Sequence, residues 1–201
     1  EIRFKEPKVN FAFTEEQEQL REFVNQFMEN YSPEAKVREL METDMGYDSE
    51  TWSMMADQLG LQSLIIPEEY GGQGFGYVEL IVVLEEMGRA LLCSPFFSTV
   101  VLAANTLIHS GDDAAKSELL PGIASGETIA TLAFTEESGK WGSDGITMLA
   151  TASSDGWELT GTKMYVLDGN AASLVLVAAC TDKGISLFKV DGEADGLSRT
   201  Q

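Results

Sequence analysis

The sequence is poor in the residues from which many active sites are built. Its 201 residues include one histidine, His109, and two cysteines, Cys93 and Cys180. A single imidazole excludes a zinc site made of histidines, and we interpret His109 as structural. The cysteines lack the spacing of a metal site, and one pair does not make a disulfide framework. We expect two buried thiols in a reducing cytoplasm and no metal.

Basic residues are also scarce. Thirteen lysines and arginines stand against 33 aspartates and glutamates, which gives a formal net charge of −20. Such a charge repels phosphate backbones and anionic lipid surfaces, so we expect neither a nucleic-acid nor a membrane partner. No apolar run approaches the roughly 20 residues that span a bilayer, and no signal segment opens the chain. These features predict a cytoplasmic protein.

The first 127 residues have the pattern of helices. Thr14 and Gln17 can form a capping box, in which each side chain accepts from the other residue's backbone N–H. The stripe that follows repeats at helical spacing, and its members are Leu20, Phe23, Val24, Phe27 and Met28. Turn and capping residues delimit further helices, which we expect from Ser32-Pro33, over Ser49–Leu59 with Gly60 closing it, over 77–91, from Ser94-Pro95 to Gly111, and over Asp113–Leu120.

After residue 127 the pattern changes to short strands. The expected strands are rich in β-branched and aromatic residues, and they are Thr128–Phe134, Ile146–Ala152, Trp157–Leu159, Thr162–Leu167, Leu174–Ala179 and Ile185–Val190. Asp155-Gly156 suits a two-residue hairpin, and residues 182–184 suit a longer one. We predict an α+β chain, with an N-terminal all-helical domain over residues 1–127 and an incomplete antiparallel, β-barrel-like domain over residues 128–201. An exposed sheet edge or a missing partner segment is expected there.

Few polar groups stand out as chemical candidates. The glycine-rich loop 71–76 lacks the spacing and the preceding strand of a dinucleotide motif, so it is more typical of a tight turn. Glu85-Glu86 is interpreted as a solvated face, whereas Glu136 follows Thr135 at the end of a strand, where loops build sites. No carboxylate is marked as a catalytic base.

Tyr165 has two open interpretations. It lies in the middle of a predicted strand, between Met164 and Val166. Its ring could stack on a planar cofactor, or it could be a core aromatic that packs across strands. The spacing alone favours the core position.

Six blocks of sequence, taken in their order along the chain, are more specific than any one of them alone. They are FTEEQEQLREF (13–23), LGLQSLIIPEEYGGQG (59–74), LEEMGRA (84–90), GDDAAKSELLPGIASGE (111–127), TEESGKWGSD (135–144) and WELTGTKMYVLDG (157–169). In this order they resemble the acyl-CoA dehydrogenase family over nearly the whole chain. The last two resemble its flavin-binding half, which usually reads TEP-x-x-GSD and then L-x-G-x-K-x-[WYF]-[IV]-[TS]-N-[AG].

The resemblance implies FAD as cofactor and assigns residues to it. Phe134 and Thr135 would line the pyrimidine side of the flavin, and Tyr165 takes the position of the stacking aromatic. Ser143 would lie by the flavin or the acyl thioester. Where the family has a Thr or Ser that bonds the flavin near N5, this chain has Leu167, which offers only its backbone N–H.

Substrate contacts are implied in the same way. Phe96 belongs to the stretch that starts the helix bordering the acyl cavity in the family, and Ser143 is the second expected substrate contact. The loop after Thr135 is two residues longer than the usual form, and Glu137 replaces its proline.

The family's fold has an N-terminal helical domain, a middle β domain and a C-terminal four-helix domain, which carries the usual glutamate base. The present residues correspond to the first two domains, so we expect this chain alone to be inactive. The implied reaction is α,β-dehydrogenation of an acyl-CoA thioester. The departures are similar to those of unlike-subunit pairs in bacterial sterol side-chain degradation, which implies a bulky, sterol-derived acyl group.

Other functions stay open at this stage. The chain could be a non-catalytic assembly partner in a heteromeric acyl-CoA dehydrogenase, or it could serve a flavin monooxygenase or a nitroalkane oxidase on the same scaffold. The expected partners are an acyl-CoA substrate, a second acyl-CoA dehydrogenase subunit in a homo- or hetero-oligomer such as a tetramer, and an electron-transfer flavoprotein.

Overall fold

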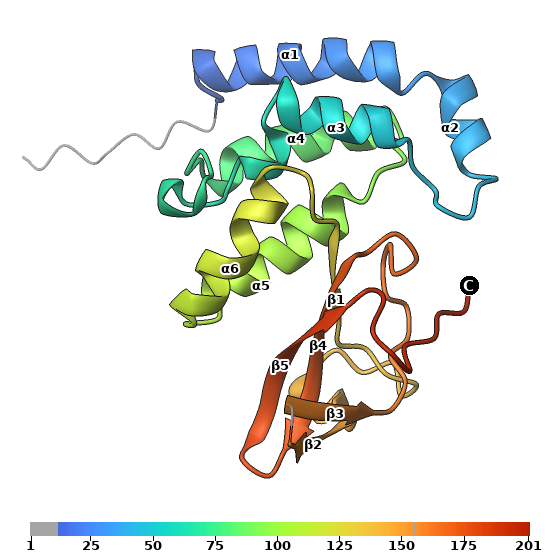
Figure 1. The fold of residues 1–201 in the computed structure, drawn as a ribbon. Coiled ribbons are helices and arrows are strands. Elements are labelled where there is room, and N and C mark those ends of the chain that lie inside the picture. Colours follow the sequence, from blue (N-terminus) through green and yellow to red (C-terminus); the bar gives the residue numbers. More distant parts are fainter. Residues whose placement is uncertain (1–11, 155) are drawn as a thin grey trace, which may run out of the picture.

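The computed structural model describes residues 12–154 and 156–201. It places helices first and a sheet after them, as the sequence predicts (Figure 1). The longer helices are α1 (Glu15–Tyr31), α2 (Glu34–Leu40), α3 (Ser49–Asp57), α4 (Tyr77–Arg89), the π-helix η3 (Phe97–Ala104), α5 (Asn105–His109) and α6 (Asp113–Ala124). Short 3-10 turns are η1 (Leu61–Ser63), η2 (Glu68–Tyr70) and η4 (Ser143–Gly145). The strands are β1 (Ala130–Ala133), β2 (Leu149–Ser153), β3 (Gly156–Thr160), β4 (Leu174–Thr181) and β5 (Gly184–Asp191).

The helix starts follow from local capping. The Thr14 hydroxyl accepts from the Gln17 N–H at 3.2 Å, and the Gln17 amide oxygen accepts from the Thr14 N–H at 2.9 Å, so the capping box is confirmed. α3 is capped one residue earlier than expected, because the Asp48 carboxylate accepts from the Thr51 N–H at 2.9 Å. Gly60 adopts the predicted left-handed conformation, with φ of 61°.

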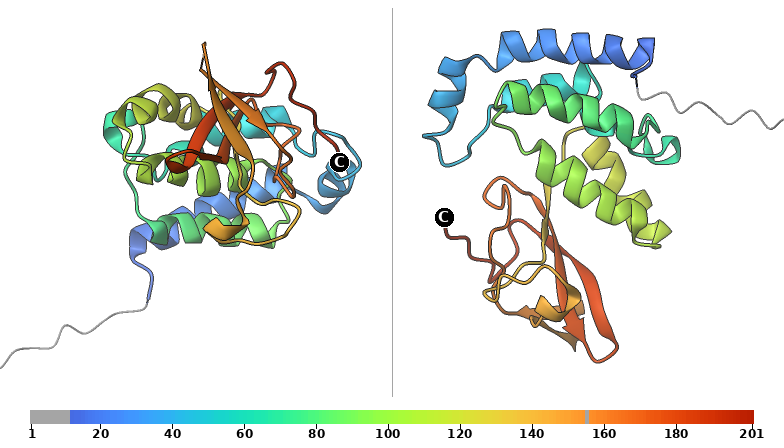
Figure 2. Two further views of the ribbon diagram at one scale, coloured as in Figure 1. Left: turned by 90° about the horizontal axis from the view of Figure 1, so that it is seen from below. Right: turned by 180° about the vertical axis from the view of Figure 1, so that it is seen from behind.

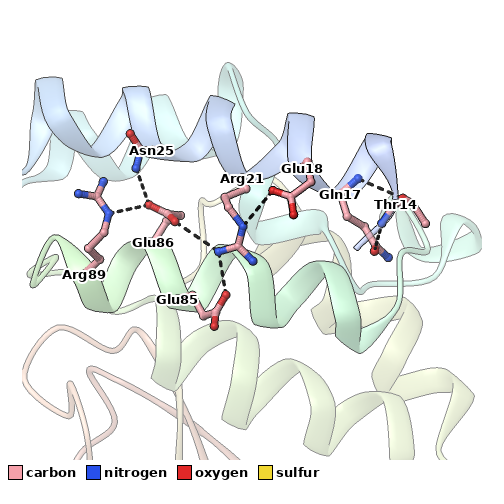
Figure 3. Close-up of polar contacts among 8 residues, drawn as sticks. All are labelled: Thr14, Gln17, Glu18, Arg21, Asn25, Glu85, Glu86 and Arg89. Atoms are coloured by element: carbon pink, nitrogen blue, oxygen red, sulfur yellow. Dashed lines mark hydrogen bonds and ion pairs between the residues drawn. The ribbon is translucent and has the colours of Figure 1, made fainter. Parts of the chain in front are cut away.

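In the pair Glu85-Glu86, the side chain of Glu85 is exposed and that of Glu86 is buried; Figure 3 shows their contacts. Glu86 is 6% exposed and lies between α1 and α4, where it accepts from Asn25 at 2.7 Å and from Arg89 at 2.8 Å. Arg21 lies 2.8 Å from Glu85 and 3.4 Å from Glu86. Burial would raise the pKa of Glu86, but these hydrogen bonds lower it. The interpretation as a solvated face is therefore wrong for Glu86, whose burial its neighbours compensate.

The sheet is open and mixed, so the expectation of purely antiparallel pairing is wrong. Its order is β1-β4-β2-β3, with β5 also on β4. β1 pairs with β4 in parallel, as β2 does through Leu149 and Cys180, whereas β2–β3 and β4–β5 are antiparallel. The long connections before β2 and β4 return the chain so that β4 runs alongside β1 in the same direction. β5 pairs only with β4 among the strands of the described ranges, and it supplies the expected free edge.

The predicted strand over Thr162–Leu167 does not form. Tyr165 and Asp168 have φ angles of 55° and 52°, in the left-handed region, which no regular strand can include. The segment is irregular, with a bend at Tyr165 and a turn that starts at Leu167, although the Met164 N–H still donates to the Thr135 carbonyl at 2.8 Å. The hairpin between β2 and β3 pairs Ser153 with Gly156, and Asp155 itself lies outside the described residues.

One hydrophobic cluster runs from the helices into the sheet. It includes Val24 of α1, Val83 of α4, Phe96, and Val175 and Ala179 of β4. Thr99 of η3 reinforces this contact, since its buried hydroxyl donates to the Ala130 carbonyl and accepts from the Ala130 N–H, both at 3.1 Å. Figure 2 shows the sheet extending away from the stacked helices on the side of η3. The domain boundary at residue 127 stays a prediction.

Candidate functional site

The segments that carry most of the predicted cofactor residues meet at a buried ion pair. Glu136, just after β1, is 7% exposed, and its Oε1 lies 2.7 Å from Lys163 Nζ. The same carboxylate accepts from the Thr147 N–H at 2.9 and 3.0 Å and from the Met148 N–H at 2.9 Å. The Thr147 hydroxyl also donates to it. One side chain thus ties the end of β1 to the start of β2 and to the turns after Gly161.

This environment keeps Glu136 charged. Burial alone would raise its pKa, but hydrogen bonds from Lys163, Thr147 and Met148 outweigh burial and lower the pKa to about 2. A general base must take up a proton near the working pH. Glu136 is too acidic for that role, and its lone pairs are engaged by donors of the chain itself. Its function here is to hold the surrounding backbone.

The ion pair brings three predicted residues close together in the fold. Lys163 Nζ also donates to the Phe134 carbonyl at 3.3 Å, while the Met164 N–H donates to the Thr135 carbonyl at 2.8 Å. Phe134 and Thr135 are therefore held beside the backbone that leads into Tyr165. Thr135 is 8% exposed, and its hydroxyl has no hydrogen bond to any residue that the structure describes.

Tyr165 is 82% exposed, so it is not a core aromatic. Its left-handed φ of 55° is costly for a bulky residue and persists only where the surroundings hold it. The Lys163–Glu136 pair and the Met164 hydrogen bond provide that support immediately before it. The result is a flat, solvent-facing ring on a constrained turn.

Leu167 follows two residues later and is 49% exposed. Its carbonyl accepts from the buried Thr131 hydroxyl at 2.7 Å. Within residues 12–154 and 156–201 its N–H donates to no acceptor, so this group is available to a ligand or to water. The next residue, Asp168, lies 2.6 Å from the hydroxyl of Ser98 on η3.

Two predicted residues lie apart from this group. Ser143 is exposed at the start of η4, next to the exposed Lys140–Asp144 ion pair. Phe96 is 2% exposed and packs in the core that the helices share with the sheet. Among the described residues no hydrogen bond or ring contact links Ser143 or Phe96 to Tyr165, and their roles stay predictions.

Sequence reasoning placed Lys163 in a motif but gave it no partner, and it missed the contact between Ser98 and Asp168. A weak signal existed for Lys163, since a lone cation in a mostly apolar stretch, KMYVL, calls for a buried anion. Ser98 and Asp168 are 70 residues apart, and no local pattern connects them.

The remaining candidates are His109, the two cysteines and the glycine-rich loop 71–76. His109 ends α5, and its Nε2 lies 2.9 Å from the Tyr77 hydroxyl. Cys93 and Cys180 are half-buried free thiols, and burial raises the pKa of Cys93. In the glycine-rich loop, a side chain at Gly72 would meet the Ile66 backbone at 1.8 Å, so close packing demands glycine there.

No group of three or more histidine, cysteine, aspartate or glutamate side chains in the described ranges is placed to hold a metal ion. None of the helices in residues 12–154 and 156–201 is long and apolar enough to cross a bilayer.

A comparison with protein families matches the helical part of the chain. Residues 14–127 match the family model for the N-terminal domain of acyl-CoA dehydrogenases. Mitochondrial isovaleryl-CoA dehydrogenase from Pongo abelii is 32% identical over 206 residues, covering 94% of this chain and 47% of that protein. The chain therefore spans about half the length of the curated relatives it matches.

Two solved structures extend the match through the sheet. The ChsE4–ChsE5 complex from Mycobacterium tuberculosis aligns with a TM-score of 0.84 at 31% identity, over 96% of this chain and 51% of that one. The Tcur3481–Tcur3483 steroid ACAD aligns with a TM-score of 0.77 at 29% identity, over 94% of this chain and 50% of that one.

Proposed function

The chain belongs to the acyl-CoA dehydrogenase family, and from this premise we propose that it is the flavin-binding part of an FAD-dependent acyl-CoA dehydrogenase subunit. The proposed reaction is α,β-dehydrogenation of an acyl-CoA thioester. Bound FAD would supply the hydride acceptor. The residues of this chain would bind and orient the cofactor, and the base would come from outside it.

The observation that carries the proposal is the exposed ring of Tyr165 on its constrained turn. An aromatic face can stack on the isoalloxazine system. The buried Thr135 and the Leu167 backbone are held beside the segment that carries Tyr165. The Thr135 hydroxyl and the Leu167 N–H have no hydrogen-bond partner among the described residues. These groups fit a planar, hydrogen-bonding cofactor, and Phe134 would line the same side.

The negative net charge of this chain favours an FAD site to which another segment or subunit contributes cations. The pyrophosphate of FAD is anionic, whereas this chain has a net charge of −20. The nearest lysine, Lys163, is neutralised by Glu136 at 2.7 Å, and Lys140 is paired with Asp144 at 2.9 Å. We therefore propose that the cations for the pyrophosphate come from elsewhere in a homo- or hetero-oligomer, and that an electron-transfer flavoprotein reoxidises the flavin.

The proposed substrate is a bulky, sterol-derived acyl-CoA. Support comes from the likeness to a steroid ACAD and to a two-component complex, at 29% and 31% identity. The similar identity to an isovaleryl-CoA dehydrogenase, 32%, keeps short branched acyl groups as the competing class. Phe96 and Ser143 remain the proposed substrate contacts. Activity of the assembled oxidoreductase on a sterol-derived acyl-CoA and on isovaleryl-CoA, measured side by side, would separate the two classes.

FAD titration of the chain, alone and with its partner subunit, tests the central proposal. Tyr165→Ala should weaken FAD binding about 2- to 10-fold, since aromatic stacking contributes about 0.5–1.5 kcal/mol. Tyr165→Phe should bind like the parent. Tyr77→Ala, which removes another exposed tyrosine, is the matched control. Equal FAD affinity for Tyr165→Ala and the parent in both preparations would overturn the assignment.

The second candidate is a non-catalytic assembly partner in a heteromeric acyl-CoA dehydrogenase. Two observations favour it: Leu167 carries no hydroxyl, and the loop after Thr135 is two residues longer than the usual form, with Glu137 in place of proline. Reduction of the complex by substrate separates the candidates. Flavin that is lost when Tyr165 is changed supports the first, and flavin that is insensitive to every change in this chain supports the second.

A further inference from the structure

Trp141 is the most exposed large hydrophobic side chain in the described ranges. Its exposed fraction is 84%, and Tyr165 follows with 82%. No hydrogen bond or ring contact joins the indole to another residue of those ranges. Trp141 belongs to the loop after Thr135 that is two residues longer than the family's usual form. The indole is therefore a large aromatic surface that contributes little to packing of the fold.

The loop that presents this ring is tightly folded. At its base, the Gly139 N–H donates to the Glu136 carbonyl at 2.8 Å, and Gly139 takes a left-handed φ of 67°. Near its tip, a Cβ atom at Gly145 would lie 2.8 Å from the Lys140 carbonyl oxygen, so the two arms of the loop touch. A backbone that is already fixed loses little freedom when its side chain binds a ligand.

One buried ion pair supports the segments that carry both exposed rings. Glu136 begins the loop of Trp141, and its partner Lys163 lies at 2.7 Å. Lys163 precedes Tyr165 by two residues. Ser143, an expected substrate contact, follows Trp141 by two residues. A substrate beside Ser143, or a cofactor on Tyr165, would therefore bind at segments that this ion pair holds.

The charge of the chain favours an uncharged aromatic group as the partner of the indole. The net charge is −20, and the neighbouring cation, Lys140, is paired with Asp144 at 2.9 Å. An adenine ring is neutral and planar, and its stacking on an aromatic side chain requires no cation. FAD and acyl-CoA, the two ligands of the proposed function, both carry adenine.

We propose that Trp141 stacks on the adenine ring of a bound ligand, FAD or acyl-CoA. Trp141 is then a binding residue for the adenosine end of that ligand, as Tyr165 is for the isoalloxazine system. The choice of these two ligands rests on the proposed function. The stacking itself rests on the exposed indole and on the loop that holds it.

Tryptophan fluorescence of the chain, alone and with its partner subunit, provides the first test. CoA should quench the emission, whereas 4′-phosphopantetheine, which keeps a phosphate but lacks adenine, should leave it unchanged. The quenching should disappear in Trp141→Ala and persist in Trp157→Phe, which changes a tryptophan that is 50% exposed. Quenching by CoA that survives in Trp141→Ala would overturn the proposal for CoA.

Ligand affinities identify which of the two ligands supplies the adenine. Trp141→Ala should weaken binding of the adenine-bearing ligand about 5- to 150-fold. Its affinity for the matched ligand without adenine should not change. CoA is compared with 4′-phosphopantetheine, and FAD with FMN. An equal loss with and without adenine would mean that the variant disturbs the whole loop, and it would contradict the stacking.

Two further outcomes are decisive. If Trp141→Ala leaves the affinities for both CoA and FAD unchanged, the proposal is wrong; release of the partner subunit in sedimentation would then assign the indole to a protein interface. If CoA quenches Trp141 but no FAD binds in either preparation, the stacking stands and the proposed function fails. The denaturation midpoint of Trp141→Ala should match that of the parent, because the indole is 84% exposed.

Discussion

At the scale of single residues, Glu136 and Asp168 are carboxyl groups whose different surroundings shift their pKa values in opposite directions. Glu136 is surrounded by donors, including a lysine, and burial strengthens each of these interactions. The Asp168 carboxylate accepts from the Ser98 hydroxyl, and no lysine, arginine or histidine in residues 12–154 and 156–201 forms an ion pair with it. Hydrogen bonds lower the pKa of Glu136, whereas burial raises the pKa of Asp168 against the opposing effect of its Ser98 hydrogen bond.

Removal of the lysine should therefore be costly. Lys163→Met would leave Glu136 buried without its cation, and we expect a loss of about 3 kcal/mol in the free energy of unfolding. Chemical denaturation measures this loss. Lys140→Met removes a lysine from an exposed pair, and it should cost less than about 1 kcal/mol. Similar losses in the two variants would mean that the buried pair does not hold this region.

At the scale of elements, η3 is the helix through which the helical part meets the sheet. Its Thr99 hydroxyl satisfies both polar groups of Ala130 in β1, and Ser98 reaches the turn after Val166. η3 is also a π-helix, a wide form that is often found at functional sites. Two adjacent hydroxyls on this element thus position both edges of the candidate site.

Thr99→Val tests the element contact. The change keeps the shape but leaves the N–H and carbonyl of Ala130 without a side-chain partner, which should cost about 1–3 kcal/mol of unfolding free energy. Thr106→Val removes a hydroxyl that donates to the Leu102 carbonyl one turn earlier, and it should cost about 0.5 kcal/mol or less. Thermal denaturation of both variants decides; a smaller loss for Thr99→Val than for Thr106→Val would contradict the role given to η3.

At the scale of the whole molecule, acidic residues govern the response to pH. The chain carries a net charge of −20, yet two of its glutamates, Glu86 and Glu136, are buried and charged at the contacts between elements. The pKa of each is lowered by hydrogen bonds that outweigh burial. Protonation of these two buried glutamates in acid should therefore destabilise the fold more than protonation of exposed carboxylates.

Acid unfolding should follow the sign of these shifts. A carboxylate whose pKa is lowered by folding stabilises the fold above its unfolded pKa, near 4.5, and this contribution is lost as pH falls toward the folded pKa of about 2. For Glu136 we expect about 1–2 kcal/mol, with allowance for screening by solvent. The free energy of unfolding, measured between pH 5 and pH 2, should fall less steeply in Glu136→Gln than in the parent. Equal slopes would show that Glu136 is not the source.

The sequence predicted the elements well where local rules act alone. The capping box at Thr14, the left-handed Gly60 and the order of helices before strands are confirmed. The exception is the stretch around Tyr165, whose β-branched and aromatic residues predicted a strand. Tyr165 within the predicted strand and Asp168 just after it are left-handed, because the contacts of Lys163, Thr131 and Asp168 with distant segments override strand propensity.

The sequence by itself determined the α+β order and the resemblance to a family, since both depend on periodicity and on blocks of residues that are adjacent in the chain. Only the tertiary structure decided which polar groups meet, that Tyr165 faces solvent, and that Glu86 is buried. The Lys163–Glu136 and Ser98–Asp168 contacts join residues 27 and 70 positions apart. Such pairs are set by how helices and strands pack, and the free energy of a buried charge depends on that packing rather than on its neighbours in sequence.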